Sequence, residues 1–237
     1  MARTAQLDLP LLMPSQAQKH VTVNEALARI DAVAQLRVLS SSVTTPPGSA
    51  DNGEGYIVPT GATGAWAGQG DSVAVWTNGG WTFLVPRPGW RAWDESRGGH
   101  RMFDGSNWID DAVAVAPGGA AISWRVLEFD HPVTAGATNL TVETIPGQAQ
   151  VLGVTGRVIA GLSGGLATWR IGVGGSDNRY GSGLGTALNS YLVGMSGSPV
   201  TYYAPTPLLL TAEGGNFGSG TIRLALHYVR LEPPRGA

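Results

Sequence analysis

The sequence predicts a mainly β protein with one short helix near its N-terminus, and three observations support this prediction. Charged residues make up only 14% of the 237 residues, against roughly 25% in an average soluble domain. The chain has 35 glycines and 8 tryptophans, a composition typical of short strands joined by tight turns. One stretch follows the period of a helix, whereas many short stretches alternate as strands do.

The overall charge and the absence of cysteine exclude several kinds of partner. The net charge is −2 and the pI is about 6.1, so no basic face for nucleic acid is expected. Without cysteine the chain forms no disulfide and no thiolate metal site. It contains neither a secretory signal nor a run of about 18 apolar residues that would span a membrane. We therefore expect a protein made in the bacterial cytoplasm, without cofactor or membrane partner.

The first expected region, residues 1–49, consists of an arm, a helix over residues 22–39 and a linker. Thr22 followed by Glu25 forms a capping box at the start of the helix. A narrow apolar stripe of this kind packs either on the chain's own sheet or in a seam between symmetry mates. The stripe consists of Ala26, Leu27, Ile30, Val33, Ala34 and Leu36 or Arg37. A run rich in serine and proline over residues 40–47 ends the helix.

The second expected region, residues 50–121, is a small Trp-rich meander of β-hairpins. Its segments 75–81 (VWTNGGW) and 102–108 (MFDGSNW) share an aromatic residue, an Asn-Gly or Asp-Gly pair and a tryptophan. These pairs favour tight hairpin turns, because both central residues accept positive φ. The flanking aromatic rings then lie across the hairpin from each other and pack. A stretch of small residues, 112–121, is expected to end the region.

The third expected region, residues 122–237, is predicted to be a β-sandwich, resembling a jelly roll. About eight short strands in about 110 residues are typical of this architecture. The last strand alternates cleanly, with Ile222 and Leu224 on one face and Arg223 on the other. The expected strands are Trp124–Phe129, Thr138–Thr144, Gln150–Ile159, Ala167–Val173, Ser190–Val193, Val200–Tyr203, Leu208–Ala212 and Thr221–Leu231.

One segment matches a catalytic motif by its letters alone. Residues 161–165 (GLSGG) fit the G-x-S-x-G elbow around a nucleophilic serine, here Ser163. That elbow requires a strand before it and a helix after it. Residues 166–171 alternate like a strand instead, so we interpret the segment as a turn.

The remaining titratable residues do not suggest catalysis or metal binding. The adjacent acidic pairs, Asp94-Glu95 and Asp110-Asp111, point to opposite faces if they lie on strands. No two histidines have the i, i+4 spacing of a helical zinc motif; they are His20, His100, His131 and His227. We therefore expect no enzymatic activity and no metal.

A polar and aromatic group in the third region is a candidate carbohydrate-binding site. The stretch 174–191 is expected to be a long glycine-rich connection, and long ordered loops are often functional. Sugar sites combine planar rings, which cover C–H faces, with Asp, Asn and Arg groups that bind hydroxyls. The alternative is an ordinary turn, because Asp-Asn is itself turn chemistry. The candidates are Asp177, Asn178, Arg179, Tyr180, Asn189, Tyr191, Tyr202 and Tyr203.

Several segments of the N-terminal half have a recognisable pattern. They are residues 9–20 (LPLLMPSQAQKH), 21–27 (VTVNEAL), 55–58 (GYIV), 62–66 (ATGAW) and 89–90 (GW). On these segments, roughly residues 7–110 resemble a family of virion proteins from tailed phages and gene transfer agents, of the head-spike or tail-fibre type. Similar proteins in gene transfer agents belong to capsid spikes that help the particle bind capsular polysaccharide.

This resemblance implies a spike or fibre subunit on the surface of a phage-like particle. Its expected partners are capsid or tail proteins, cell-surface polysaccharide and further copies of itself, with a trimer favoured and a pentamer possible. Two alternatives remain open. The chain is a purely architectural spike base that anchors a separate receptor-binding protein, or it is a polysaccharide-degrading enzyme, which would need two carboxylates facing each other across a cleft.

Overall fold

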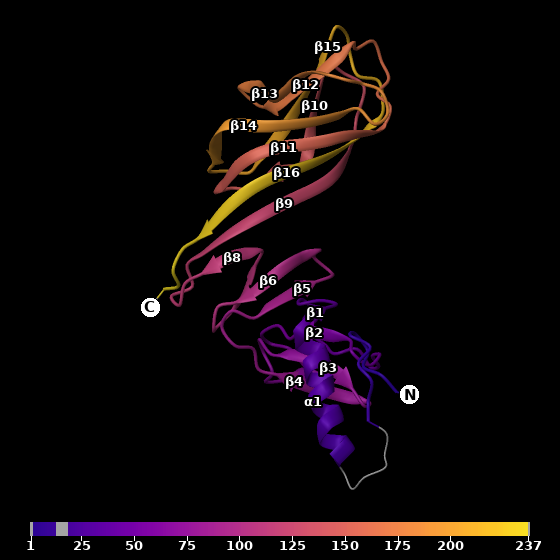
Figure 1. Cartoon of the computed structure of the whole chain (residues 1–237). Coiled ribbons are helices and arrows are strands. Elements are labelled where there is room, and N and C mark those ends of the chain that lie inside the picture. The colour runs from indigo at the N-terminus through magenta and orange to yellow at the C-terminus, as the bar shows by residue number, and fades with distance from the viewer. Residues whose placement is uncertain (1, 13–18, 237) are drawn as a thin grey trace. The chain divides into compact units, whose positions relative to one another are not determined.

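The computed structural model describes residues 2–12 and 19–236, and it is mainly β with one short N-terminal helix (Figure 1). This confirms the predicted fold class. Residues 13–18, part of the run that carries the family resemblance, lie outside the described residues, as do the side chains of Lys19 and His20. The chain divides into two compact units, Met1–Ala121 with Pro234–Ala237, and Ile122–Pro233. Among the described helices, none has the length and apolarity needed to cross a membrane.

The N-terminal unit contains the helix α1 (Lys19–Ala34), a short 3-10 helix η1 (Gly64–Trp66) and two small sheets. One sheet has the order β1-β5-β6-β7, with β1 (Arg37–Val38), β5 (Arg91–Asp94), β6 (Gly99–Phe103) and β7 (Trp108–Asp110). The other has the order β2-β3-β4, with β2 (Gly55–Ile57), β3 (Val73–Thr77) and β4 (Gly80–Leu84). The strand β8 (Ala112–Val115) follows.

The helix differs from the prediction at both ends. It already includes Thr22, so the expected capping box lies inside it. It stops at Ala34, because Leu36 and Val38 are buried in the core and Arg37–Val38 pairs in parallel with β5. The predicted apolar stripe is also largely uncovered, since Ile30 and Val33 are exposed whereas Asp31 and Ala32 are buried.

The two predicted hairpins form, with different turns. Asn78 and Gly79 both have positive φ, at 52° and 82°, and they join Trp76 to Trp81 across a two-residue turn as predicted. The second turn is longer, because the Asp104 carboxylate accepts hydrogen bonds from the backbone N–H groups of Ser106 and Asn107, both at 2.8 Å. It joins a second aromatic pair, Phe103 and Trp108.

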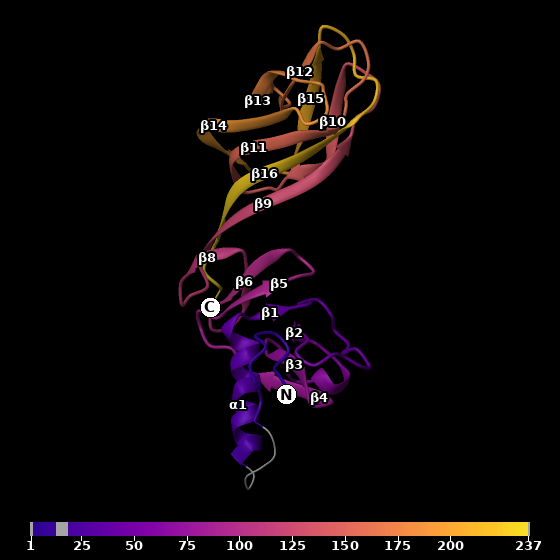
Figure 2. The ribbon, with the colours of Figure 1, turned by 45° about the vertical axis from the view of Figure 1, so that its right-hand side comes forward.

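The C-terminal unit is an eight-stranded sandwich (Figures 1 and 2). Within it, one sheet has the order β14-β11-β16-β9 and the other β10-β15-β12-β13. Successive strands mostly alternate between the sheets, which is the jelly-roll topology of two Greek keys. The strands are β9 (Ala121–Pro132), β10 (Thr138–Ile145), β11 (Ala149–Ala160), β12 (Thr168–Val173), β13 (Ser176–Leu184), β14 (Tyr191–Tyr202), β15 (Thr206–Glu213) and β16 (Thr221–Glu232).

The core of the sandwich is formed by the inward residues of both sheets. Val154 and Leu226 contribute from one sheet, and Ile171 and Leu210 from the other, all with no exposed surface. Alternation along each strand places these apolar side chains inward and leaves their neighbours on the outer face. The outer face of the β14-β11-β16-β9 sheet therefore carries the residues on which the candidate site depends.

Candidate functional site

The structure separates seven of the eight predicted sugar-binding residues into three places. The stretch expected as a loop contains β13, which pairs with β12. Tyr180 on β13 is only 2% exposed, and its hydroxyl lies 2.9 Å from that of half-buried Tyr202. Burial, together with this hydrogen bond, raises the pKa of Tyr180. Tyr180 therefore belongs to the sandwich core and offers no ring face to a sugar.

Asp177 is part of a cross-strand ion-pair network. Its Oδ2 accepts from Arg170 Nη2 at 2.7 Å and from Nε at 2.9 Å, and Arg170 Nη1 lies 3.4 Å from Glu213 Oε1. Hydrogen bonding to Asp177 is the main reason why the pKa of Arg170 is raised. The network ties β12 to both neighbouring strands. Asn178 and Arg179, next to it, are exposed.

Asn189 and Tyr191 form the third place, where they meet Arg157 of β11. Tyr191 begins β14 and is 69% exposed. The guanidinium carbon of Arg157 lies 5.7 Å from the centroid of the Tyr191 ring, within the range of a cation–π contact. Arg157 Nη1 also donates to the carbonyl oxygen of Asn189 at 3.2 Å. The Tyr191 ring is thus held in place by Arg157 and remains largely accessible.

A shallow groove of about 400 Å³ runs beside this ring on the outer face of the sheet. Strand register creates it: Arg157 lies opposite both Tyr191 and Arg223, and Thr155 lies opposite both Val193 and Ala225. Residues directly opposite on paired strands point to the same face. We call this hollow the Tyr191 groove; its side chains include Glu128, Thr155, Arg157, Tyr191, Val193, Arg223 and Ala225.

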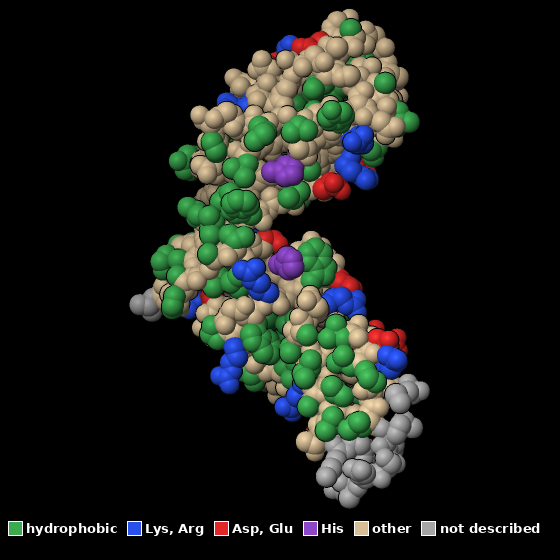
Figure 3. Space-filling model, viewed as in Figure 1, with side chains coloured by type: hydrophobic (Ala, Val, Ile, Leu, Met, Phe, Trp, Pro, Cys, Tyr) green, Lys and Arg blue, Asp and Glu red, His purple; other side chains and the backbone are tan. Residues whose placement is uncertain are grey.

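Fixed charges line one end of the Tyr191 groove. Arg223 donates from Nε and Nη2 to the two carboxylate oxygens of Asp130, at 2.7 and 2.8 Å. This bidentate pair lowers the pKa of Asp130 and raises that of Arg223. Glu128 Oε1 lies 4.0 Å from Arg223 Nε. In Figure 3, charged side chains gather at one end of this face beside hydrophobic ones. The groove therefore offers an aromatic surface together with hydrogen-bond donors and acceptors.

Of the eight residues proposed from the sequence, only Tyr191 lines the Tyr191 groove. Three charged residues of the groove were not among those eight: Arg157, Glu128 and Arg223. These residues lie on three different strands, and only the strand pairing brings them together. The alternation of the last strand was the one available signal, because it placed Arg223 on the outward face.

Two other positions from the sequence analysis lie outside the Tyr191 groove. Tyr203, 85% exposed, follows the end of β14. Ser163 lies between β11 and β12, and its hydroxyl is 2.8 Å from that of Ser219. The segment after it leads into the strand β12. Among the described residues, no group of three or more His, Asp or Glu side chains could hold a metal ion.

Comparisons with known proteins found a family model and a solved structure that are similar to part of this chain. A family model described as "Protein of unknown function (DUF2793)" matches residues 23–109. Among solved structures, the "Cyanophage Pam1 capsid asymmetric unit" is similar to part of the chain, with 20% identity and a TM-score of 0.33 over 47% of this chain and 84% of that one. The search of curated proteins found no match. The topology itself defines the C-terminal unit as a jelly-roll domain.

Proposed function

We propose that this chain is a structural subunit of a phage-like particle and that the Tyr191 groove attaches the particle to cell-surface polysaccharide. The resemblance of residues 7–110 to virion proteins supports the first part. The jelly-roll fold, which recurs in viral capsid and lectin domains, is compatible with both parts. The groove itself is the observation that carries the attachment role.

The groove suits a hydroxyl-rich ligand. The accessible face of Tyr191 can cover the C–H face of a sugar ring, while Arg157, Thr155 and Glu128 bind its hydroxyls. The groove is shallow and open to water, so we expect a single site to bind at around millimolar concentration, about 4 kcal/mol. Several copies on one particle would then provide avidity, and we propose a homo-oligomer, acting without catalysis.

The decisive experiment compares two exposed tyrosines in the full chain. We expect Tyr191→Ala to weaken binding to immobilised bacterial capsular polysaccharide by about tenfold or more, which corresponds to about 1.4 kcal/mol. Tyr203→Ala is the matched control and should bind as the unaltered chain does. Because both rings are largely exposed, both variants should melt at the same temperature as the unaltered chain.

Each alternative function predicts a different result. If the folded chain binds no polysaccharide in a broad panel, the architectural spike base is correct and the attachment proposal fails. If Tyr203→Ala loses binding and Tyr191→Ala does not, the site lies at the end of β14. Release of reducing ends from the polysaccharide would identify an enzyme and contradict the proposal.

A further inference from the structure

The helix α1 buries a polar and a small residue against its own unit and leaves large apolar residues exposed. Asp31 and Ala32 are its buried residues, whereas Val23, Ile30 and Val33 are exposed, Ile30 by 51%. A surface helix ordinarily buries its apolar stripe and exposes its polar residues. In Figure 3, hydrophobic side chains gather over the part of the N-terminal unit where Figure 1 draws α1.

The N-terminal arm fixes α1 in this orientation. The Asp31 carboxylate accepts hydrogen bonds from Thr4 Oγ1 at 2.7 Å and from the backbone N–H groups of Gln6 and Leu7, at 2.9 and 2.6 Å. Rotating the apolar stripe inward would break all three bonds and expose the arm. The hydrogen bonds between Asp31 and the arm therefore fix this orientation of α1.

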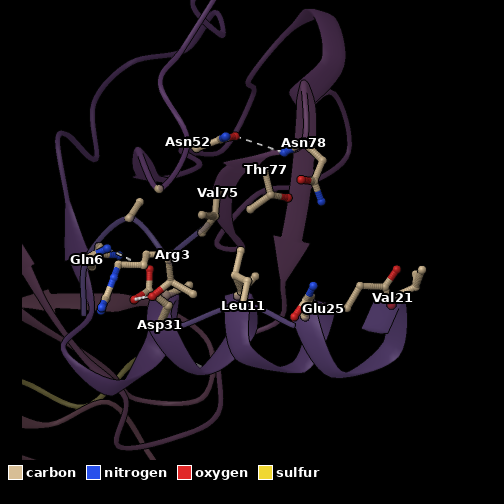
Figure 4. A pocket seen from close by; sticks show the side chains of 16 residues that line it. Arg3, Gln6, Leu11, Val21, Glu25, Asp31, Asn52, Val75, Thr77 and Asn78 are labelled. Carbon is tan, nitrogen blue, oxygen red and sulfur yellow. Dashed lines mark hydrogen bonds between the residues drawn. The ribbon is translucent and has the colours of Figure 1, made fainter. Parts of the chain in front are cut away.

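The inner side of α1 is loosely packed. A cavity of about 320 Å³ lies between the arm, the helix and the β3–β4 hairpin, bordered by Leu11, Glu25, Val75 and Asn78 (Figure 4). The helix side chains that border the space beside the hairpin are mostly small or polar, such as Ala28, Ala32 and Glu25, so the helix gains little from apolar packing there. Val23, Ile30 and Val33 remain exposed on its other side.

The spacing of the exposed residues identifies what kind of partner fits. Val23, Ala26, Ile30 and Val33 follow one another at intervals of three, four and three residues, which are the a and d positions of two heptads. Leu27 and Ala34 widen the stripe, and it contains no charge. A heptad repeat is the pattern by which like helices pack side by side, so the seam is complementary to another copy of itself.

We propose that α1 packs against the α1 helices of two further copies of this chain in a parallel three-helix bundle. The β-branched residues Ile30 and Val33 at successive a and d positions favour more than two helices. This inference identifies the contact surface of the homo-oligomer that we proposed above. It rests on the proposed function only for its biological role.

The available area also favours a ring of copies over a single pair. A 16-residue helix is about 24 Å long, too short for one pair of helices to reach the roughly 800 Å² per partner of a stable interface. The apolar surface continues past its end onto exposed Leu7 and Trp93, which border a hollow beside Val33. In a three-fold bundle each copy contacts two neighbours and covers both flanks.

Sedimentation analysis of the full chain tests this assignment. We expect a trimer for the unaltered chain, a monomer for Ile30→Asp, and a trimer for the control Val85→Asp, whose exposed side chain belongs to the same unit but not to α1. Ile30 is exposed in the single chain, so circular dichroism of Ile30→Asp should match that of the unaltered chain. A second variant, Val23→Asp, should behave like Ile30→Asp.

Three results would overturn the assignment: a monomeric unaltered chain at about 100 µM, a trimer that survives both seam variants, or an assembly of a different size that depends on Ile30. Failure of the attachment proposal is recognised separately. The Ile30→Asp monomer keeps its Tyr191 groove, so its single-site polysaccharide binding, measured by NMR titration, reports on the groove alone.

Discussion

The hydroxyl groups of Tyr180 and Tyr202 lie 2.9 Å apart, joining β13 to the end of β14 inside the jelly roll. Both residues looked from the sequence like components of a sugar site. Their hydrogen bond and the burial of Tyr180 assign them to the structure of the sandwich.

Replacing Tyr180 by phenylalanine should lower the free energy of unfolding by about 1 kcal/mol, because it removes one hydrogen bond and keeps the ring. Tyr180→Ala should cost roughly 3–5 kcal/mol, since it leaves a cavity. Urea unfolding measures both. Polysaccharide binding by Tyr180→Phe should be unchanged, and a specific loss of binding would return Tyr180 to the candidate site.

Tyr180 should also make the fold sensitive to alkali. Burial raises its pKa above the ordinary value of 10.0, so the unfolded chain releases this proton at lower pH than the folded chain does. The stabilisation is complete below about pH 10 and declines as the pH rises above it. Melting temperatures from pH 8 to 11 should show this decline, and Tyr180→Phe should show less of it.

The two hairpin tryptophans should differ in their contribution to stability. Trp108 is buried and its Nε1 donates to the carbonyl oxygen of Asp71 at 2.9 Å. Trp76 is only half-buried against Trp81. Trp108→Ala should therefore cost about 3–5 kcal/mol, and Trp76→Ala roughly 1–2 kcal/mol. Equal losses in chemical unfolding would contradict this difference.

The arm should depend on a single carboxylate. Asp31→Ala removes the acceptor of three hydrogen bonds from Thr4, Gln6 and Leu7, so the arm should detach and trypsin should cleave after Arg3 much faster. Asp8→Ala is the control, because Asp8 is exposed and its ion pair with Arg3 lies within the arm itself. An unchanged cleavage rate in Asp31→Ala would show that other contacts hold the arm.

Local patterns in the sequence predicted the fold better than they predicted the site. Asn78-Gly79 specified its turn because the required φ values belong to those two residues. Alternation located most sandwich strands, because outward and inward positions differ in polarity. It failed for β13, where the segment from Ser176 to Leu184 is rich in glycine and pairs irregularly with β12.

The Tyr191 groove depends on register between strands that are distant in the sequence. Arg157 and Arg223 are 66 positions apart and become neighbours only when β11 pairs with β16. Likewise, the helical period of residues 22–39 revealed an apolar stripe but not the direction in which it faces. That direction depends on the hydrogen bonds of Asp31 with the arm.

The last prediction concerns the C-terminal residues Pro234–Ala237, which belong to the N-terminal unit. Arg235 forms an ion pair with the Asp104 carboxylate, which has no exposed side-chain surface, and its Nη2 donates to the carbonyl oxygen of Pro117 at 2.9 Å. Arg235→Ala leaves that buried carboxylate without its cation, which should lower the free energy of unfolding by about 1–3 kcal/mol.

Tryptophan fluorescence during unfolding measures this loss, because it reports mainly on the N-terminal unit. Six of the eight tryptophans lie in that unit: Trp66, Trp76, Trp81, Trp90, Trp93 and Trp108. Arg179→Ala, a change of an exposed arginine in the other unit, should leave the fluorescence transition in place. If Arg235→Ala leaves it in place as well, the ion pair contributes nothing to the stability of the N-terminal unit.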